Sequence, residues 1–137
     1  MFKVTKILNS SKGAPEITYI YLKEGESYKK GTLVTFKSGW PVNCTQTDMP
    51  THIILADVEN APHNYSVPAI PLTPDVIVET VGNSYATTFH IGEKYALNVL
   101  EGYAVGIKNV KDGGVATVFS NYSDPNEQYG KVCVRFV

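Results

Sequence analysis

Short runs of apolar and β-branched residues recur along the chain about every ten positions. Each run is rich in Val, Ile, Thr, Tyr or Phe, and the residues between runs include Gly, Pro, Asn and Asp, which favour turns. Short strands at this spacing are typical of an all-β barrel or sandwich. The expected strands lie at residues 2–8, 17–22, 32–37, 42–45, 52–58, 67–72, 76–81, 85–90, 94–100, 104–110, 115–119 and 131–137.

The last run has the clearest alternation of apolar and polar residues. Because successive side chains on a strand point to opposite faces, one set should face the core and the other should face away from it. The expected core set is Val132, Val134 and Phe136, and the expected outer set is Lys131, Cys133 and Arg135.

A proline-rich stretch at residues 67–75 interrupts the series of regular strands. Pro68, Pro71 and Pro74 have no N–H to donate to a β-ladder. The stretch is therefore expected to be an edge strand or an extended crossover, and not a central strand. It is also apolar enough to lie against the other half of the fold or against a neighbouring subunit.

Two parts of the chain, beginning at residues 31–36 and 92–97, open similar series of strands and turns. Each series continues through a glycine reversal, at Gly39 or Gly102, and the offset between the two grows from about 61 to about 65 residues. Two interpretations stay open. The fold is built from two similar β units, or the match is the self-similarity of any all-β chain with regular turns.

The whole pattern predicts an all-β fold: a small, compact β-barrel or sandwich of short antiparallel strands with an N-terminal extension. Residues 28–137 are expected to form a single barrel-like domain, and residues 1–27 an N-terminal arm with edge strands.

The composition indicates a folded chain and excludes several partners. Of the 137 residues, 43% are hydrophobic, which is enough to fill a core. Twelve Lys and Arg residues stand against thirteen Asp and Glu residues, without the basic clusters that bind nucleic acid or anionic membranes. No apolar stretch approaches the roughly 20 residues that span a bilayer, and the N-terminus has no signal-peptide pattern. We therefore expect synthesis in a cytoplasm and neither a nucleic-acid nor a membrane partner.

Residues that could carry chemistry are present, but their spacing matches no known site. His52, His63 and His90 do not have the spacing of metal ligands on one element. Cys44 and Cys133 lack the CxxC pattern of redox and zinc sites, so both are expected to be reduced, apolar strand residues. GxSxG, GxGxxG and P-loop patterns are absent from the sequence. The sequence thus predicts no enzyme activity, no metal and no cofactor.

Tyrosine is the unusual component of the composition. Nine tyrosines and a single tryptophan, Trp40, suit a wet protein interface, because the ring buries apolar area while its polar group keeps a partner. A carbohydrate-binding platform uses the same residue types. Tyrosine is also a favoured strand residue whose hydroxyl reaches the rim of a barrel, so these interpretations stay open.

Six segments, taken in order, match a family pattern. They are residues 31–39, 50–57, 67–70, 91–95, 113–116 and 130–136. Their order resembles the small all-β head decoration proteins, also called capsid cement proteins, of tailed bacteriophages and their prophage relatives. The resemblance covers most of residues 28–137, and residues 1–27 match it least.

This resemblance implies a structural virion protein that binds the outer surface of an assembled capsid and stabilises it. The implied partner is the major capsid protein, with the decoration protein bound as a homo-trimer. The implied location is the capsid exterior, after synthesis in the host cytoplasm. The alternative from another class is a carbohydrate- or host-surface-binding β module, such as a fibre or adhesin domain.

The N-terminal segment carries apolar side chains that need a partner. We expect residues 1–22 to contribute to docking on the capsid shell or on neighbouring subunits. The alternative is that residues 17–22 close the edge of the barrel and protect it from aggregation. The candidate interface residues are Phe2, Val4, Ile7, Ile17, Tyr19, Tyr21, Trp40, Pro68 and Pro71.

Overall fold

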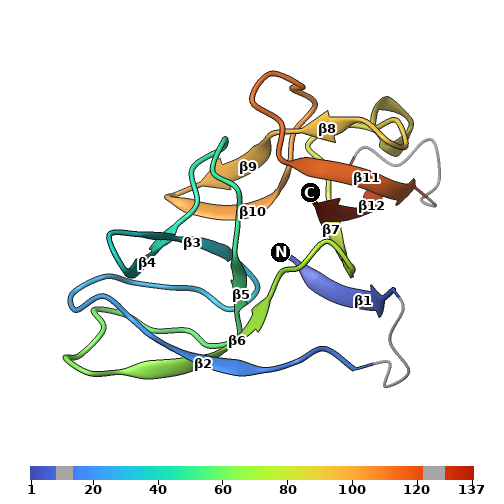
Figure 1. Cartoon of the computed structure of the whole chain (residues 1–137). Helices are drawn as coiled ribbons and strands as arrows, with labels where there is room; N and C mark the ends of the chain where they lie inside the picture. Colours follow the sequence, from blue (N-terminus) through green and yellow to red (C-terminus); the bar gives the residue numbers. More distant parts are fainter. Residues whose placement is uncertain (9–13, 122–128) are drawn as a thin grey trace.

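Three antiparallel sheets make up the computed structural model of the chain, which describes residues 1–8, 14–121 and 129–137 (Figure 1). The strands of the first sheet, in spatial order, are β2 (Thr18–Tyr21), β6 (Ser66–Pro71), β5 (His52–Ile54), β3 (Leu33–Lys37) and β4 (Trp40–Asn43). Those of the second sheet are β1 (Lys3–Ile7), β7 (Val76–Val81), β12 (Lys131–Phe136), β11 (Ala116–Asn121) and β8 (Lys94–Tyr95). The small third sheet is a hairpin of β9 (Leu97–Leu100) and β10 (Tyr103–Ile107).

The predicted all-β class is confirmed. The sheets do not close into a barrel, and the fold is sandwich-like, with a large apolar core to which both five-stranded sheets contribute. Phe2, Leu33, Ile53, Val78 and Phe136 are among the residues of this core. A smaller apolar cluster fills the other face of the first sheet, where the loops on either side of Tyr28 and Ala61 cover it.

The predicted strand at residues 85–90 is wrong, because this segment contains the 3-10 turn η1 (Ala86–Thr88). Ala86 and Phe89 are both fully buried, and they lie three positions apart. A 3-10 turn places residues at this spacing on one side, whereas a strand would point them to opposite faces. The need to bury both side chains therefore decides the local conformation.

The proline-rich stretch is also corrected, because β6 is a central strand between β2 and β5. The N–H of Leu72 donates to the carbonyl of Thr51, so the even-numbered residues of β6 direct their backbone groups toward β5. Pro68 therefore directs its nitrogen past the end of β5, and its carbonyl accepts the N–H of Leu55 at 3.0 Å. Pro71 directs its nitrogen toward β2, beyond the point where β2 begins. Each proline lies where the neighbouring strand has ended, so the sheet loses no ladder bond.

Strand β12 confirms the predicted core face, with Val132, Val134 and Phe136 all buried. Cys133 faces away from this core, as predicted, and its side chain is nevertheless buried, at 5% exposure. The reason is that β12 lies inside its sheet and Thr5 of β1 reaches over its other face, with the Thr5 Oγ1 3.9 Å from the Cys133 Sγ.

The strands repeat one order of pairing in two units. In the first unit the spatial order of the strands is β2, β6, β5, β3 and β4. In the second unit the corresponding order is β7, β12, β11, then β8 together with β9, and finally β10. The same backbone hydrogen bond opens each unit, from the Gly31 N–H to the Ile54 carbonyl and from the Gly92 N–H to the Val118 carbonyl, both at 2.8 Å. This repeated pairing favours the interpretation as two similar β units.

Both units also contain the same hairpin turn. Ser38 and Gly39 have φ values of 51° and 82°, and Glu101 and Gly102 have φ values of 53° and 85°. Two successive residues with positive φ form the type I′ turn, whose twist matches that of the strands it joins. The two glycines tolerate this backbone conformation without strain.

A small insertion explains why the second unit has a separate third sheet. Eight positions separate Gly31 from Gly39, but ten separate Gly92 from Gly102. In the first unit β3 runs unbroken through this stretch, whereas in the second unit the two extra residues split it into β8 and β9. The β9–β10 hairpin is thereby released from the ladder of the second sheet.

The Tyr28 hydroxyl provides a test of the smaller core. Tyr28 is 1% exposed, and its hydroxyl donates to the buried Pro41 carbonyl at 2.7 Å. Tyr28→Phe should lower the free energy of unfolding by about 1–3 kcal/mol, because the carbonyl then has no replacement donor. Tyr65→Phe, at an exposed ring, is the matched control and should change it by less than about 0.5 kcal/mol. Urea denaturation measures both, and equal effects would contradict this role of the bond.

Candidate binding surface

The N-terminal strand is fixed across the junction of the two units. β1 pairs with β7, and the N–H of Phe2 donates to the Gly31 carbonyl at 2.8 Å. Gly31 has a φ of +83°, and a Cβ there would lie 3.1 Å from the Cβ of Met1. A glycine is therefore needed both for the backbone conformation and for the close approach of Met1. Phe2 is buried beside Phe136, with ring centroids 6.2 Å apart.

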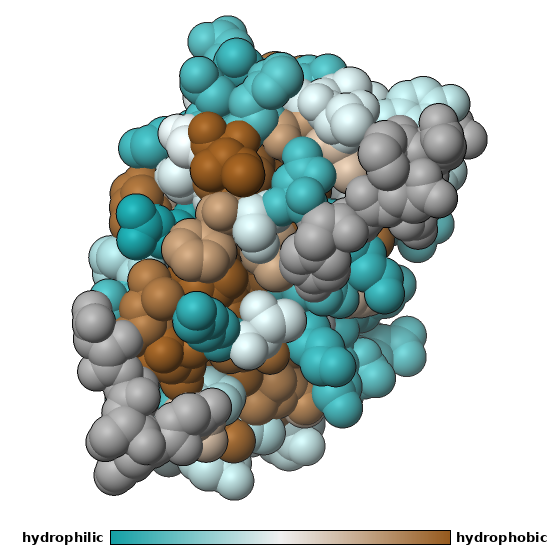
Figure 2. Space-filling view, turned by 90° about the vertical axis from the view of Figure 1, so that its right-hand side faces the viewer, coloured by the Kyte–Doolittle hydropathy of each residue, from teal (hydrophilic) through white to brown (hydrophobic). Residues whose placement is uncertain are grey.

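Two hollows lie beside this strand and meet at Pro15. The first, of about 550 Å³, separates β1 from the first sheet and is lined by apolar residues that include Phe2, Val4, Pro15, Ile53, Leu55 and Ile70. The second, of about 570 Å³, is lined by residues that include Ile7, Pro15, Glu16, Pro71, Thr73 and Val76. We call the two together the apolar groove. Figure 2 shows hydrophobic side chains gathered on the face that looks to the right in Figure 1, where β1 lies.

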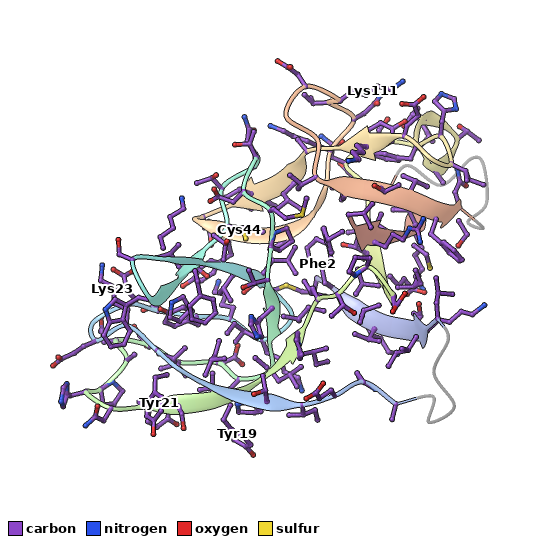
Figure 3. The ribbon with its side chains drawn as sticks, viewed as in Figure 1. Phe2, Tyr19, Tyr21, Lys23, Cys44 and Lys111 are labelled. Carbon is purple, nitrogen blue, oxygen red and sulfur yellow. The ribbon has the colours of Figure 1, made fainter. Side chains whose placement is uncertain are left out.

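Exposed tyrosines extend the apolar surface beyond the groove. Tyr19 and Tyr21 are 68% and 61% exposed, and both point away from the body of the protein (Figure 3). Tyr19 lies opposite Pro68 in the β2–β6 ladder, and the Pro68 carbonyl accepts the N–H of Leu55, which lines the groove. Because side chains alternate along β6 and Ile70 lies opposite Ile53, Tyr19, Tyr21 and Pro68, here called the tyrosine face, share the sheet face of the groove residues Ile53 and Ile70.

The candidate interface residues divide into three groups. Phe2, Val4, Ile7 and Pro71 line the groove, and Tyr19, Tyr21 and Pro68 make the tyrosine face. Ile17 is 56% exposed just before β2. Trp40 is 44% exposed on β4, at the other end of the strand order, although the curl of the sheet brings β4 close to β2.

Several residues that line the groove were not among the candidates from the sequence, including Pro15, Ile53, Leu55 and Ile70. Ile53 and Leu55 fall in the apolar run at residues 52–58, but their alternation does not reveal which face meets β1. A pattern of period two assigns side chains to faces and not to the element that covers each face. Only the packing of the sheets identifies these residues.

The potential chemical residues lie in separate, mostly structural environments. His52 is half-buried, packs edge-on against the Phe36 ring and has its pKa lowered by burial. His63 is an exposed neighbour of Glu24, with 3.5 Å between Nδ1 and Oε2. Cys44 and Cys133 are buried and form no disulfide, and burial raises the pKa of the Cys44 thiol to about 12. Among the described residues, no group of three His, Cys, Asp or Glu side chains could hold a metal ion.

A third hollow, of about 510 Å³, mixes aromatic and charged residues. Its lining includes Tyr28, Lys29, Asp57, Glu59 and Tyr103. The Lys29 Nζ lies 4.7 Å from the centroid of the Tyr103 ring, which is cation–π geometry. The Tyr28 hydroxyl already donates to the Pro41 carbonyl. The aromatic groups of this hollow are therefore occupied by contacts within the chain.

Comparison with known proteins identifies no relative: no family model, curated protein or solved structure matches the chain. In the part of the chain that the structure describes, no helix is long and apolar enough to cross a membrane.

Two substitutions separate the structural part of the surface from its exposed part. Phe2→Ala should lower the free energy of unfolding by about 3–5 kcal/mol, because Phe2 is 4% exposed within the large core. Ile17→Ala is the matched control and should lower it by less than about 1 kcal/mol, because Ile17 is mostly exposed. Chemical denaturation measures both values. Similar losses at the two positions would contradict the burial of Phe2.

The two cysteines should be unreactive in the folded protein at pH 8. A pKa of about 12 keeps the Cys44 thiol protonated at this pH, and only the thiolate attacks a disulfide reagent. Cys133 is shielded by its burial. An aromatic disulfide reagent should therefore release no chromophore from the native chain and two equivalents after denaturation. Rapid release of one equivalent from the native chain would show an accessible thiolate.

Proposed function

We propose that this protein is a structural virion protein, a decoration or cement protein that docks on the outer surface of a bacteriophage capsid and stabilises it. In this proposal its partner is the major capsid protein, and the capsid exterior is its working location. It acts by contact, without enzyme activity, cofactor or nucleic acid. The single observation that carries the docking site is the apolar groove with its adjoining tyrosine face.

The form of this surface suits docking on another protein. Exposed large apolar side chains are ordinary when scattered, whereas a continuous apolar surface rimmed by charges is typical of an interaction site. Here the groove is bordered by Lys3 and Lys30 at one end and by Glu16 at the other. Its walls come from two different sheets, so a bound segment would contact both units. Such a contact stabilises the bound partner and the fold together.

The order of sequence segments supports the identity of the partner. The resemblance to decoration proteins covers most of residues 28–137, and the groove adds a site in which residues 1–8 take part. The nearly balanced charge is consistent with a protein partner, because attachment to nucleic acid needs a basic surface. The homo-trimeric arrangement implied by the resemblance is part of the proposal for the capsid-bound protein.

A carbohydrate- or host-surface-binding module is the second candidate, and the third hollow is the observation that favours it. Tyr103 and the carboxylates of Asp57 and Glu59 are residue types that bind sugars. The contact of Lys29 with the Tyr103 ring opposes this function, because a sugar that stacks on the ring must first displace the Lys29 side chain. The groove therefore supports protein docking better than this hollow supports sugar binding.

A charge placed in the groove tests the proposed function. Leu55→Glu should weaken binding to emptied, expanded capsids of the phage that carries the gene by about 100-fold or more, because docking would then bury a charged carboxylate in place of an apolar side chain. Ile91→Glu, at a residue 69% exposed away from the groove, is the control and should bind as the unmodified protein does. Co-sedimentation with capsids measures the binding.

Two outcomes would count against the proposal. Equal capsid binding by both variants would remove the groove from the mechanism. Absence of capsid binding by the unmodified protein, together with retention on a glycan array, would favour the second candidate. The circular dichroism spectrum of Leu55→Glu must match that of the unmodified chain, and Leu55→Ser provides a milder change if it does not.

A further inference from the structure

The repeat shows which edge of the first unit lacks a covering strand equivalent to β1. In the ladders, Ile20 lies opposite Val67 and Thr80 lies opposite Val132. Because β6 and β12 occupy the same place in their units, β2 corresponds to β7, with Thr18 at the place of Val78. Strand β7 is covered on its outer side by β1 at Val76–Glu79. Among the described residues, no strand pairs with the corresponding side of β2.

The second unit also shows that this position has room for a strand. Near its end, β7 is approached by β10 through a bridge between Gly82 and Ile107, and β1 still pairs with the preceding residues. In the first unit β4 likewise comes close to β2 without forming a ladder. The open part of the edge therefore corresponds to residues 16–19, where β1 lies in the second unit.

The backbone at this edge is directed outward. Leu22 donates its N–H to the Tyr65 carbonyl, so Leu22, Ile20 and Thr18 direct their backbone groups toward β6. By the same alternation, Ile17 and Tyr19 direct their N–H and carbonyl groups away from the sheet. Their side chains are 56% and 68% exposed. One short edge thus presents both unpaired backbone groups and large apolar side chains.

The other edges of the two five-stranded sheets have features that oppose strand addition, whereas β2 has no lysine, proline or irregular register. β1 carries Lys3 and Lys6 and an irregular register between Val4 and Lys6. β4 contains Pro41, and β8 is only two residues long. Lysines, bulges, prolines and short length are the usual protection of an edge strand. The sequence of β2, Thr-Tyr-Ile-Tyr, combines β-branched and aromatic residues that favour pairing.

We propose that the free edge of β2 pairs with β2 of a second copy of this chain, antiparallel and across a two-fold axis. In the register that fits the edge, Thr18 faces Thr18 of the second copy, and each Ile17 forms a hydrogen-bonded pair with the opposite Tyr19. The first sheet of one copy and the first sheet of the other then form one continuous sheet. The hydrogen-bonded pairing ends at Tyr19, the position that corresponds to Glu79, where the β1–β7 pairing also ends.

The chemistry of the edge selects a second copy as the occupant. A two-fold axis requires a strand to be compatible with its own reversed sequence. In this register Ile17 and Tyr19 make an apolar pair on the outward face, and threonine pairs with threonine, a favourable cross-strand combination. Glu16 lies opposite Ile20, so the register places no like charges together. The outcome is a dimer in solution, distinct from the capsid-bound trimer.

A proline at position 19 tests the pairing. Tyr19→Pro removes only the outward N–H, because the bonds to β6 come from the flanking residues, and a proline is tolerated on an edge strand with its nitrogen toward solvent. The unmodified protein should be a dimer at submillimolar concentration in sedimentation equilibrium. Tyr19→Pro should weaken association by about 100-fold or more. Tyr19→Val, which keeps the N–H and loses the ring, should weaken it by about tenfold or less.

A disulfide test supports the register without relying on the proline variant. A Cα separation of about 4.5 Å is typical of a non-hydrogen-bonded antiparallel pair and allows a disulfide. Thr18→Cys should therefore form a covalent dimer under mild oxidation. Glu26→Cys, at an exposed loop residue, should not. The two native cysteines are buried and add little background.

Several results would overturn the inference. These are a monomer at every concentration, a trimer in solution, a dimer that Tyr19→Pro leaves unchanged while remaining folded, or no disulfide from Thr18→Cys. If the free protein is a monomer and β2 is protected from hydrogen exchange only on capsids, the edge pairs with the shell protein instead. The two proposals fail separately, because Leu55 follows β5, on the other side of β6 from the β2 edge, so Leu55→Glu tests capsid binding without changing the paired strand.

Discussion

Each of the two β units leaves an apolar sheet face that it cannot bury alone, and the rest of the structure depends on the burial of these faces against each other. Leu33, Ile53 and Ile70 from the first unit meet Val78, Val134 and Phe136 from the second in one core. Either unit alone would expose this apolar face to water, so neither is expected to persist without the other. Phe2 joins this core as the contribution of the N-terminal strand.

The surface features arise from an asymmetry between the two units. β1 covers the outer edge of β7, and its own side chains form one wall of the apolar groove. The corresponding edge, β2, has no such cover among the described residues. The N-terminal strand covers only one of the two equivalent edges, so a groove forms beside the covered edge, and the backbone groups of the other edge have no partner strand among the described residues.

The polar side chains of the described residues serve mostly structural contacts. The half-buried His52 packs against an aromatic ring, and the buried Cys44 has a pKa far above neutrality. The buried tyrosines use their hydroxyls to hold backbone groups, Tyr28 that of Pro41 in β4 and Tyr95 those of Thr88 and His90. The exposed tyrosines Tyr19 and Tyr21 instead present their rings outward. The same residue type thus stabilises the fold at two positions and forms the candidate interface at two others.

The sequence by itself determined the all-β class, most strand positions, the glycine turns and the core face of β12, because these depend on local alternation and on backbone conformations that few residues adopt. Alternation also places Tyr19 and Tyr21 on the face of β2 opposite to that of Ile20. Tertiary structure decided the rest. Ala86 and Phe89 were forced into a turn by a core that both must enter, and Cys133 was buried by a strand far away in the sequence. Pro68 and Pro71 became compatible with a central strand only because the neighbouring strands end beside them. The groove, too, belongs to tertiary structure, because alternation tells which face a side chain occupies but not which element covers that face.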